Sequence, residues 1–111
     1  MRMKQGDLFP FEYNLTYDDN TPIDLTGATV AITMTLDDEE TPIVNDESCT
    51  VVTASEGKIN YQWQSGETDD IGMYRIEFHI TFNSGATLTV PSGDVLWMFI
   101  VPSLRTVVVP P

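Results

Sequence analysis

The chain has 111 residues, 41% of them hydrophobic, which fits one domain with a single core. Its 17 acidic and five basic residues give a formal charge of −12, which argues against nucleic acid as a partner because a phosphate backbone would be repelled. The same charge disfavours anionic lipid, and no run of about 18 apolar residues is present to span a membrane.

Apolar residues recur with period two from the start of the chain. The first expected strand places Phe9, Phe11, Tyr13, Leu15 and Tyr17 on one face. Turn residues follow at 18–22 and 24–27. The second expected strand covers residues 28–36, where apolar side chains alternate with β-branched polar ones, as on a sheet with one solvated surface.

An acidic turn at residues 37–40 separates these strands from the rest of the chain. Further strand-like runs lie at 43–44, 49–54, 58–63, 74–82, 86–90 and 95–101, with glycines between many of them. No window keeps helical spacing for more than a turn. The pattern predicts an all-β fold, an immunoglobulin-like antiparallel β-sandwich of about seven or eight strands. We expect this domain to span residues 1–102 and an apolar C-terminal tail to follow at 103–111.

The longest alternating run begins with a motif that suggests a structural corner. Asp70, Gly72 and Tyr74 are spaced by two at the point where a polar loop enters the strand. In immunoglobulin-like sandwiches a tyrosine at this point bonds through its hydroxyl to backbone a few residues upstream. We therefore predict that Tyr74 closes the corner, that Gly72 permits a tight turn and that Asp70 accepts hydrogen bonds from backbone N–H groups within it.

Residues capable of catalysis are few. His79, the sole histidine, alternates onto the polar face with Glu77 and Arg75, and no Ser or Cys motif accompanies it. Cys49, the sole cysteine, excludes an internal disulfide and a multi-thiolate zinc site, and we interpret it as a small, at least half-buried side chain. The sequence predicts no catalytic residue, no cofactor and no enzyme activity.

The acidic turns at 18–20 and 37–40 offer oxygen ligands of the kind that calcium prefers. Neither turn has the loop pattern of an EF-hand, so we interpret them as solvated turns and predict no metal site.

Two tryptophans and the C-terminal region are the candidate binding features. Trp63 and Trp97 are expected to be core anchors, with a sugar-stacking platform as the alternative. Residues 95–101 are apolar on both faces, so this strand is either central in the sheet or covered by a partner. We predict a contact, with another protein or with a second copy of the chain, that includes the tail and adds it to a neighbour's sheet edge. The candidate interface consists of Trp97, Phe99, Val107, Val108 and Val109.

Several short motifs follow one another in a familiar order: residues 4–7, 22–30, 57–63, 68–74, then Glu77-Phe78 and Pro91. Over about residues 4–101 the sequence resembles the N-terminal domain of baseplate upper proteins of long-tailed bacteriophages that infect Gram-positive bacteria. The resemblance implies a β-sandwich of the tail tip or baseplate that binds neighbouring tail proteins and has no catalytic residues. It also implies a place in the virion tail, after synthesis in the cytoplasm of the bacterial host.

Members of this family often continue into a helical stalk and further domains, whereas the sequence here stops at Pro111. We therefore expect a free-standing accessory or adaptor protein. The alternative function is a carbohydrate-binding module that contacts the host cell wall, and it requires Trp63 or Trp97 to be exposed to solvent.

Overall fold

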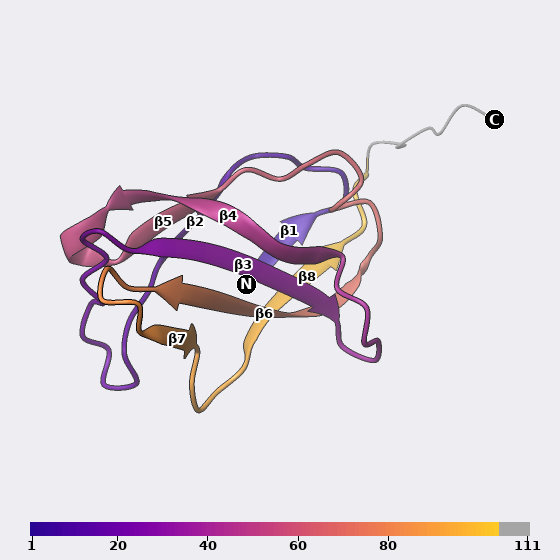
Figure 1. The fold of residues 1–111 in the computed structure, drawn as a ribbon. Coiled ribbons are helices and arrows are strands. Elements are labelled where there is room, and N and C mark those ends of the chain that lie inside the picture. Colours follow the sequence, from indigo (N-terminus) through magenta and orange to yellow (C-terminus); the bar gives the residue numbers. More distant parts are fainter. Residues whose placement is uncertain (105–111) are drawn as a thin grey trace.

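The computed structural model describes residues 1–104, which form one curled, mostly antiparallel β-sheet (Figure 1). The strands pair in the order β1-β8-β6-β3-β4-β5-β2, and β7 pairs with β6 beside β8. The all-β prediction is confirmed, and the immunoglobulin-like detail stays a prediction with which this pairing does not conflict. The strands are β1 (Arg2–Lys4), β2 (Phe11–Asn14), β3 (Thr29–Leu36), β4 (Val44–Thr53), β5 (Lys58–Tyr61), β6 (Gly72–Thr81), β7 (Thr87–Val90) and β8 (Leu96–Val101).

Strand β6 organises the sheet. One of its edges pairs with the whole of β3, and its other edge is shared by β8, along residues 72–76, and β7, along residues 78–81. The loop at residues 91–95 separates these last two strands. Its alternate residues are buried because they point to the inner face of the sheet, where they pack in the core.

Strand β4 carries the sheet from one layer to the other. Its first half pairs with β3, and its second half pairs with β5, which in turn pairs with β2. The prediction of separate runs at 43–44 and 49–54 was therefore wrong. The polar residues between them belong to β4: Glu47 and Ser48 pair with β3, and a bulge precedes them, where Asp46 has a φ of 53° and donates its backbone N–H to Thr33 Oγ1 at 3.0 Å.

Strand β1 was not identified from the sequence. Its three residues pair in parallel with β8, and this pairing is extended at both ends by hydrogen bonds from Phe99 N to Met1 O (2.9 Å) and from Gln5 N to Val101 O (2.8 Å). Strand β8 consequently lies between β1 and β6. Its inner side chains, Met98 and Ile100, belong to the core, which does not account for the apolar side chains on its outer face.

The first expected strand is shorter than its pattern indicated. Phe9 precedes β2 and is 85% exposed, and Tyr17 follows it in a turn, where Tyr17 N donates to Thr21 O at 2.9 Å. The expected strand therefore does not extend to these two residues. Phe11, Tyr13 and Leu15 do pack on or within the core.

The core joins the two layers through aromatic rings. Phe78 of β6 is fully buried and its ring stacks on Tyr13 at a centroid distance of 5.7 Å. Trp63 is only 3% exposed and meets the ring of Tyr61 edge-on. The interpretation of Trp63 as a core anchor is thus confirmed. No helix among residues 1–104 is long and apolar enough to cross a membrane.

Candidate functional site

The corner residues lie where the loop at residues 67–71 enters β6. Tyr74 is 1% exposed, and its hydroxyl donates a hydrogen bond of 2.8 Å to the backbone carbonyl of Asp70. Burial of the phenol raises the pKa of Tyr74. A Cβ atom at Gly72 would lie 2.6 Å from Leu36 Cδ1, so glycine leaves room for the leucine side chain. The hydroxyl of Tyr74 thus ties the loop to the strand through a partly buried hydrogen bond.

Replacing Tyr74 with phenylalanine should lower the free energy of unfolding by about 1 kcal/mol, because the hydrogen bond to the Asp70 carbonyl is lost while the buried ring keeps its packing. Urea denaturation measures this value. Tyr17→Phe is the control, since Tyr17 is 45% exposed and should tolerate the change. Equal unfolding midpoints for Tyr74→Phe and the unmodified protein would contradict a stabilising role for the corner.

The residues with nucleophilic or basic chemistry do not converge. Cys49 lies opposite Val30 on the inner face, and burial raises the pKa of its thiol to about 12. His79 lies opposite Ala31 on the outer face of the sheet. Its ring contacts Thr89 Oγ1 at 3.2 Å and Glu77 Oε2 at 3.7 Å. The sheet therefore separates the thiol from the imidazole.

Two aspartates of the predicted turns bind their own loops. Asp19 accepts hydrogen bonds from the hydroxyl and the N–H of Thr21, and Asp24 does the same with Thr26. These bonds lower the pKa values of both carboxyl groups. Within residues 1–104 no group of three or more His, Cys, Asp or Glu side chains has an arrangement that could hold a metal ion.

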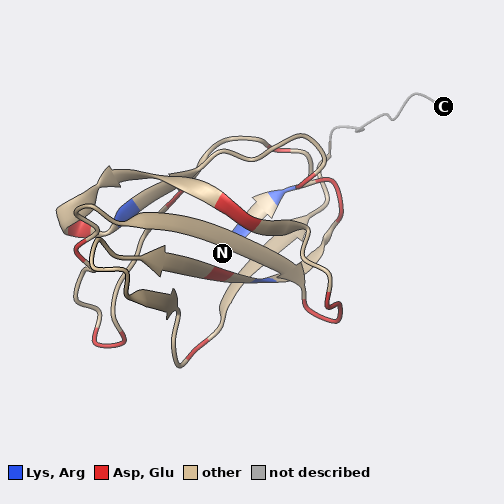
Figure 2. Ribbon diagram, in the orientation of Figure 1, with Lys and Arg blue, Asp and Glu red and all other residues tan. Residues whose placement is uncertain are grey.

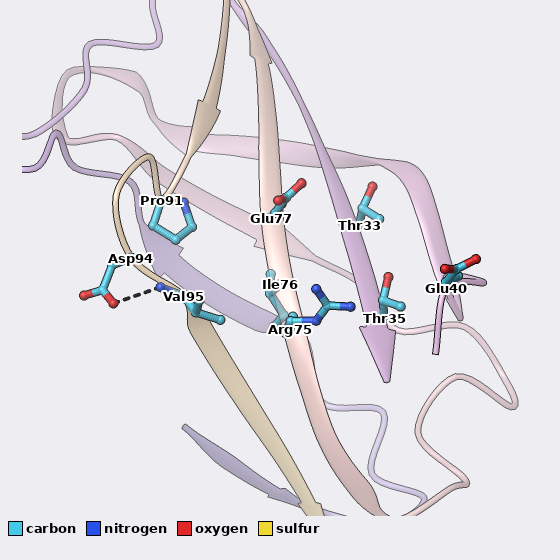
Figure 3. A pocket seen from close by; sticks show the side chains of 9 residues that line it. All are labelled: Thr33, Thr35, Glu40, Arg75, Ile76, Glu77, Pro91, Asp94 and Val95. Atoms are coloured by element: carbon cyan, nitrogen blue, oxygen red, sulfur yellow. Dashed lines mark hydrogen bonds between the residues drawn. The ribbon is translucent and has the colours of Figure 1, made fainter. Parts of the chain in front are cut away.

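A groove of about 280 Å³ crosses the outer face of β3 and β6 beside the loop at residues 91–95 (Figure 3). Its walls mix hydroxyl, carboxylate and apolar groups. Arg75 lies in the groove, with its Nε 3.8 Å from Asp37 Oδ1 and its Nη2 3.4 Å from Glu39 O. Asp94 accepts a hydrogen bond of 2.9 Å from Val95 N and so orders the loop. The groove is an open surface feature beside β8.

The outer surface of β1, β8 and the start of β6 forms a second candidate site, which we call the β8 face. On β8, Met98 and Ile100 point into the core, so Trp97, Phe99 and Val101 point outward and remain partly exposed. Phe99 lies between Arg2 of β1 and Met73 of β6. The β8 face consists of Arg2, Lys4, Met73, Arg75, Trp97, Phe99 and Val101.

Charge is distributed unevenly around this face. Arg2, Lys4 and Arg75 are three of the five basic residues in the sequence, and all three belong to the β8 face. Figure 2 shows basic segments on β1, at the start of β6 and on β5, and acidic segments on β4, further along β6 and in several loops. The sequence alone did not reveal this grouping, because Arg75 is distant from β1 along the chain.

The structure describes two of the five predicted interface residues. Trp97 and Phe99 are two residues apart on β8, and both side chains face outward. Val107, Val108 and Val109 lie outside the described residues, so their part in an interface stays a prediction.

One comparison with known proteins found a relationship. The family model described as the BppU N-terminal domain matches residues 2–90. This range contains β1 to β7 and most of the chain, but it ends before β8. No match was found among curated proteins or among solved structures.

Proposed function

We propose, from the premise that the chain belongs to the family of BppU N-terminal domains, that it is an adaptor which holds neighbouring proteins together in a phage tail. The family is that of the N-terminal domain of baseplate upper proteins, so the chain is a structural protein of the phage baseplate, located in the tail of the virion. The finer role, direct binding of adjacent tail or baseplate proteins, is the proposal.

The observation that carries the adaptor role is the apolar outer surface of β8. Trp97 and Phe99 are large aromatic side chains on a strand whose inner face already fills the core. Large aromatic anchors are enriched at the centres of protein interfaces. A partner that covers these rings would remove apolar area from water without disturbing the fold.

The C-terminal tail is the second part of the proposed contact. Residues 107–109 are all valine, and after Asp94 the sole charged residue in the sequence is Arg105. Such a segment suits an added strand at the sheet edge of a neighbouring protein or of a second copy of the chain.

Of the two tryptophans on which the carbohydrate-binding alternative depends, one is buried. Trp63 packs in the core and offers no ring face to a sugar. Trp97 is partly exposed, and it lies beside Phe99 and Arg75 on a sheet surface, where it is the one tryptophan still available to this alternative. The adaptor function is therefore the better supported proposal.

The test is to place the protein in the virion and to vary the proposed contact. Antibodies against the chain should label the distal end of the tail in purified particles of the encoding phage, as seen by electron microscopy. The double variant Trp97→Ala and Phe99→Ala should be incorporated at least about tenfold less than the unmodified protein, because two anchors are removed.

Val52→Ala is the matched control, since Val52 is 50% exposed on β4 and does not belong to the β8 face. Particles that carry no copy of the protein would overturn the adaptor proposal. Full incorporation of the double variant would move the contact away from β8.

A further inference from the structure

We propose that the β8 face binds an acidic protein surface, so that the neighbour of this domain presents Asp or Glu side chains around an apolar centre. This inference rests on the proposed function, because it names the chemistry of the partner at the same face. It follows from the charge, exposure and strand register of the described residues.

The face is basic in a protein that is otherwise strongly acidic. Strands β1 and β8 contain no Asp or Glu, and neither do the first four residues of β6. Arg2 and Lys4 are exposed and make no ion pair within the described part of the chain. Arg75 shares its charge with Asp37 at 3.8 Å, but 45% of its side chain is still exposed. The basic groups are thus available to carboxylates of a partner.

The apolar centre lies between these charges. Phe99 is opposite Arg2 on one side and opposite Met73 on the other, and Trp97 is opposite Arg75. Aromatic and arginine side chains together are the composition enriched in interface hot spots. A partner whose carboxylates surround an apolar patch would match both components of the face.

The rest of the molecule restricts which acidic partner fits. At physiological salt the Debye length is about 8 Å, so a compact protein surface on the β8 face would respond mainly to the local basic groups. A nucleic acid is a long polyanion and would extend beyond this face toward the acidic turns of a chain with a charge of −12. The charge pattern therefore favours a protein and also orients it, because other faces repel the same partner.

Trp97 provides a direct readout of binding to the full chain. Trp63 is buried, so quenching by acrylamide and changes of emission on titration should come mainly from Trp97. The probe is a synthetic peptide in which glutamate alternates with leucine, and the comparison peptide has lysine at each glutamate position. We expect the acidic peptide to protect Trp97 from quenching, and the basic peptide to do so at least about tenfold more weakly.

Charge reversal identifies the groups responsible. Arg2→Glu with Lys4→Glu should weaken binding of the acidic peptide by about tenfold or more at low salt, and added salt should reduce the difference. The single variants Arg2→Glu and Lys4→Glu are compared with Lys58→Glu, which changes the net charge by the same amount as either of them but lies on β5, where Lys58 pairs with Glu12 at 3.2 Å. Thermal melting shows whether each variant is folded. If the reversed variant does not fold, Arg2→Gln with Lys4→Gln replaces it, with a smaller expected loss.

Three results would overturn the inference. The acidic and basic peptides could protect Trp97 equally, Lys58→Glu could weaken binding of the acidic peptide as much as the reversals at Arg2 and Lys4, or an oligothymidylate could bind more strongly than the acidic peptide. These failures leave the adaptor proposal intact if the protein is still found at the tail of the virion. Conversely, the protein could bind the acidic peptide selectively and yet be absent from virions. The inference about the β8 face would then hold, and the adaptor proposal would fail.

Discussion

A Gly57→Ala variant is expected to lose about 3 kcal/mol or more of its free energy of unfolding. Gly57 has a φ of +68°, a left-handed conformation that costs an L-residue about 1 to 2 kcal/mol. A Cβ atom there would also lie 2.4 Å from Leu15 O and 2.9 Å from Ile23 O. Both neighbours are backbone atoms, so no side chain can rotate away to relieve the contact.

The clash would damage a junction of three segments. Leu15 N donates to Gly57 O at 2.8 Å, and Ile23 N donates to Leu15 O at 3.0 Å. The side chains of Leu15 and Ile23 are fully buried. Displacing either carbonyl therefore disturbs hydrogen bonds and core packing together, which raises the cost above that of φ strain alone.

Gly66→Ala separates these two effects. Gly66 also has a positive φ, +93°, but an added Cβ would meet no atom within 4 Å. This control should lose only about 1 kcal/mol, the cost of the conformation. Urea denaturation of both variants provides the comparison. Similar losses would show that the backbone at Gly57 can move apart to accept a methyl group.

Phe78→Ala is expected to have the largest effect of a side-chain change, a loss of about 3 to 5 kcal/mol. Phe78 is fully buried on β6 and its ring lies 5.7 Å from that of Tyr13 and 6.4 Å from that of Phe11, both on β2. Because β2 and β6 belong to facing parts of the curled sheet, the ring helps to hold them together. Its removal leaves a cavity between the two layers that these rings cannot fill without moving the strands.

Phe99→Ala is the matched control for this variant. It removes the same side chain from the outer surface of β8, where the ring is partly exposed. We expect a loss of about 1 kcal/mol or less, because the core keeps its contacts. Thermal and urea unfolding measure both variants. If Phe99→Ala destabilised the protein as much as Phe78→Ala, the β8 face would belong to the core of the isolated domain and could not serve as a contact.

The parts of the fold that follow from local pattern were predictable. Alternation identified β3, β5 and β6, since successive side chains in a strand point to opposite faces. The family resemblance stated from the residues agrees with the match over residues 2–90. The all-β class required no knowledge of strand pairing. The expectation that both tryptophans are core anchors was confirmed for Trp63 and wrong for Trp97, which lies on the outer face of β8 and is partly exposed.

Pairing between distant segments decided the rest. The three residues of β1 carry no strand pattern of their own and are ordered by β8, which lies almost a hundred residues later in the chain. The polar middle of β4 resembles a turn, and its place in a strand depends on the bulge opposite β3.

The β8 face likewise exists only in the folded chain. The sequence by itself determined that Trp97 and Phe99 share one side of a strand, and that the chain as a whole is acidic. Only the tertiary structure decided that this side faces outward and that Arg2, Lys4 and Arg75 lie around it. The physical reason is that alternation is set by the chain locally, whereas the choice of buried side and the neighbours across a sheet depend on which strands pair.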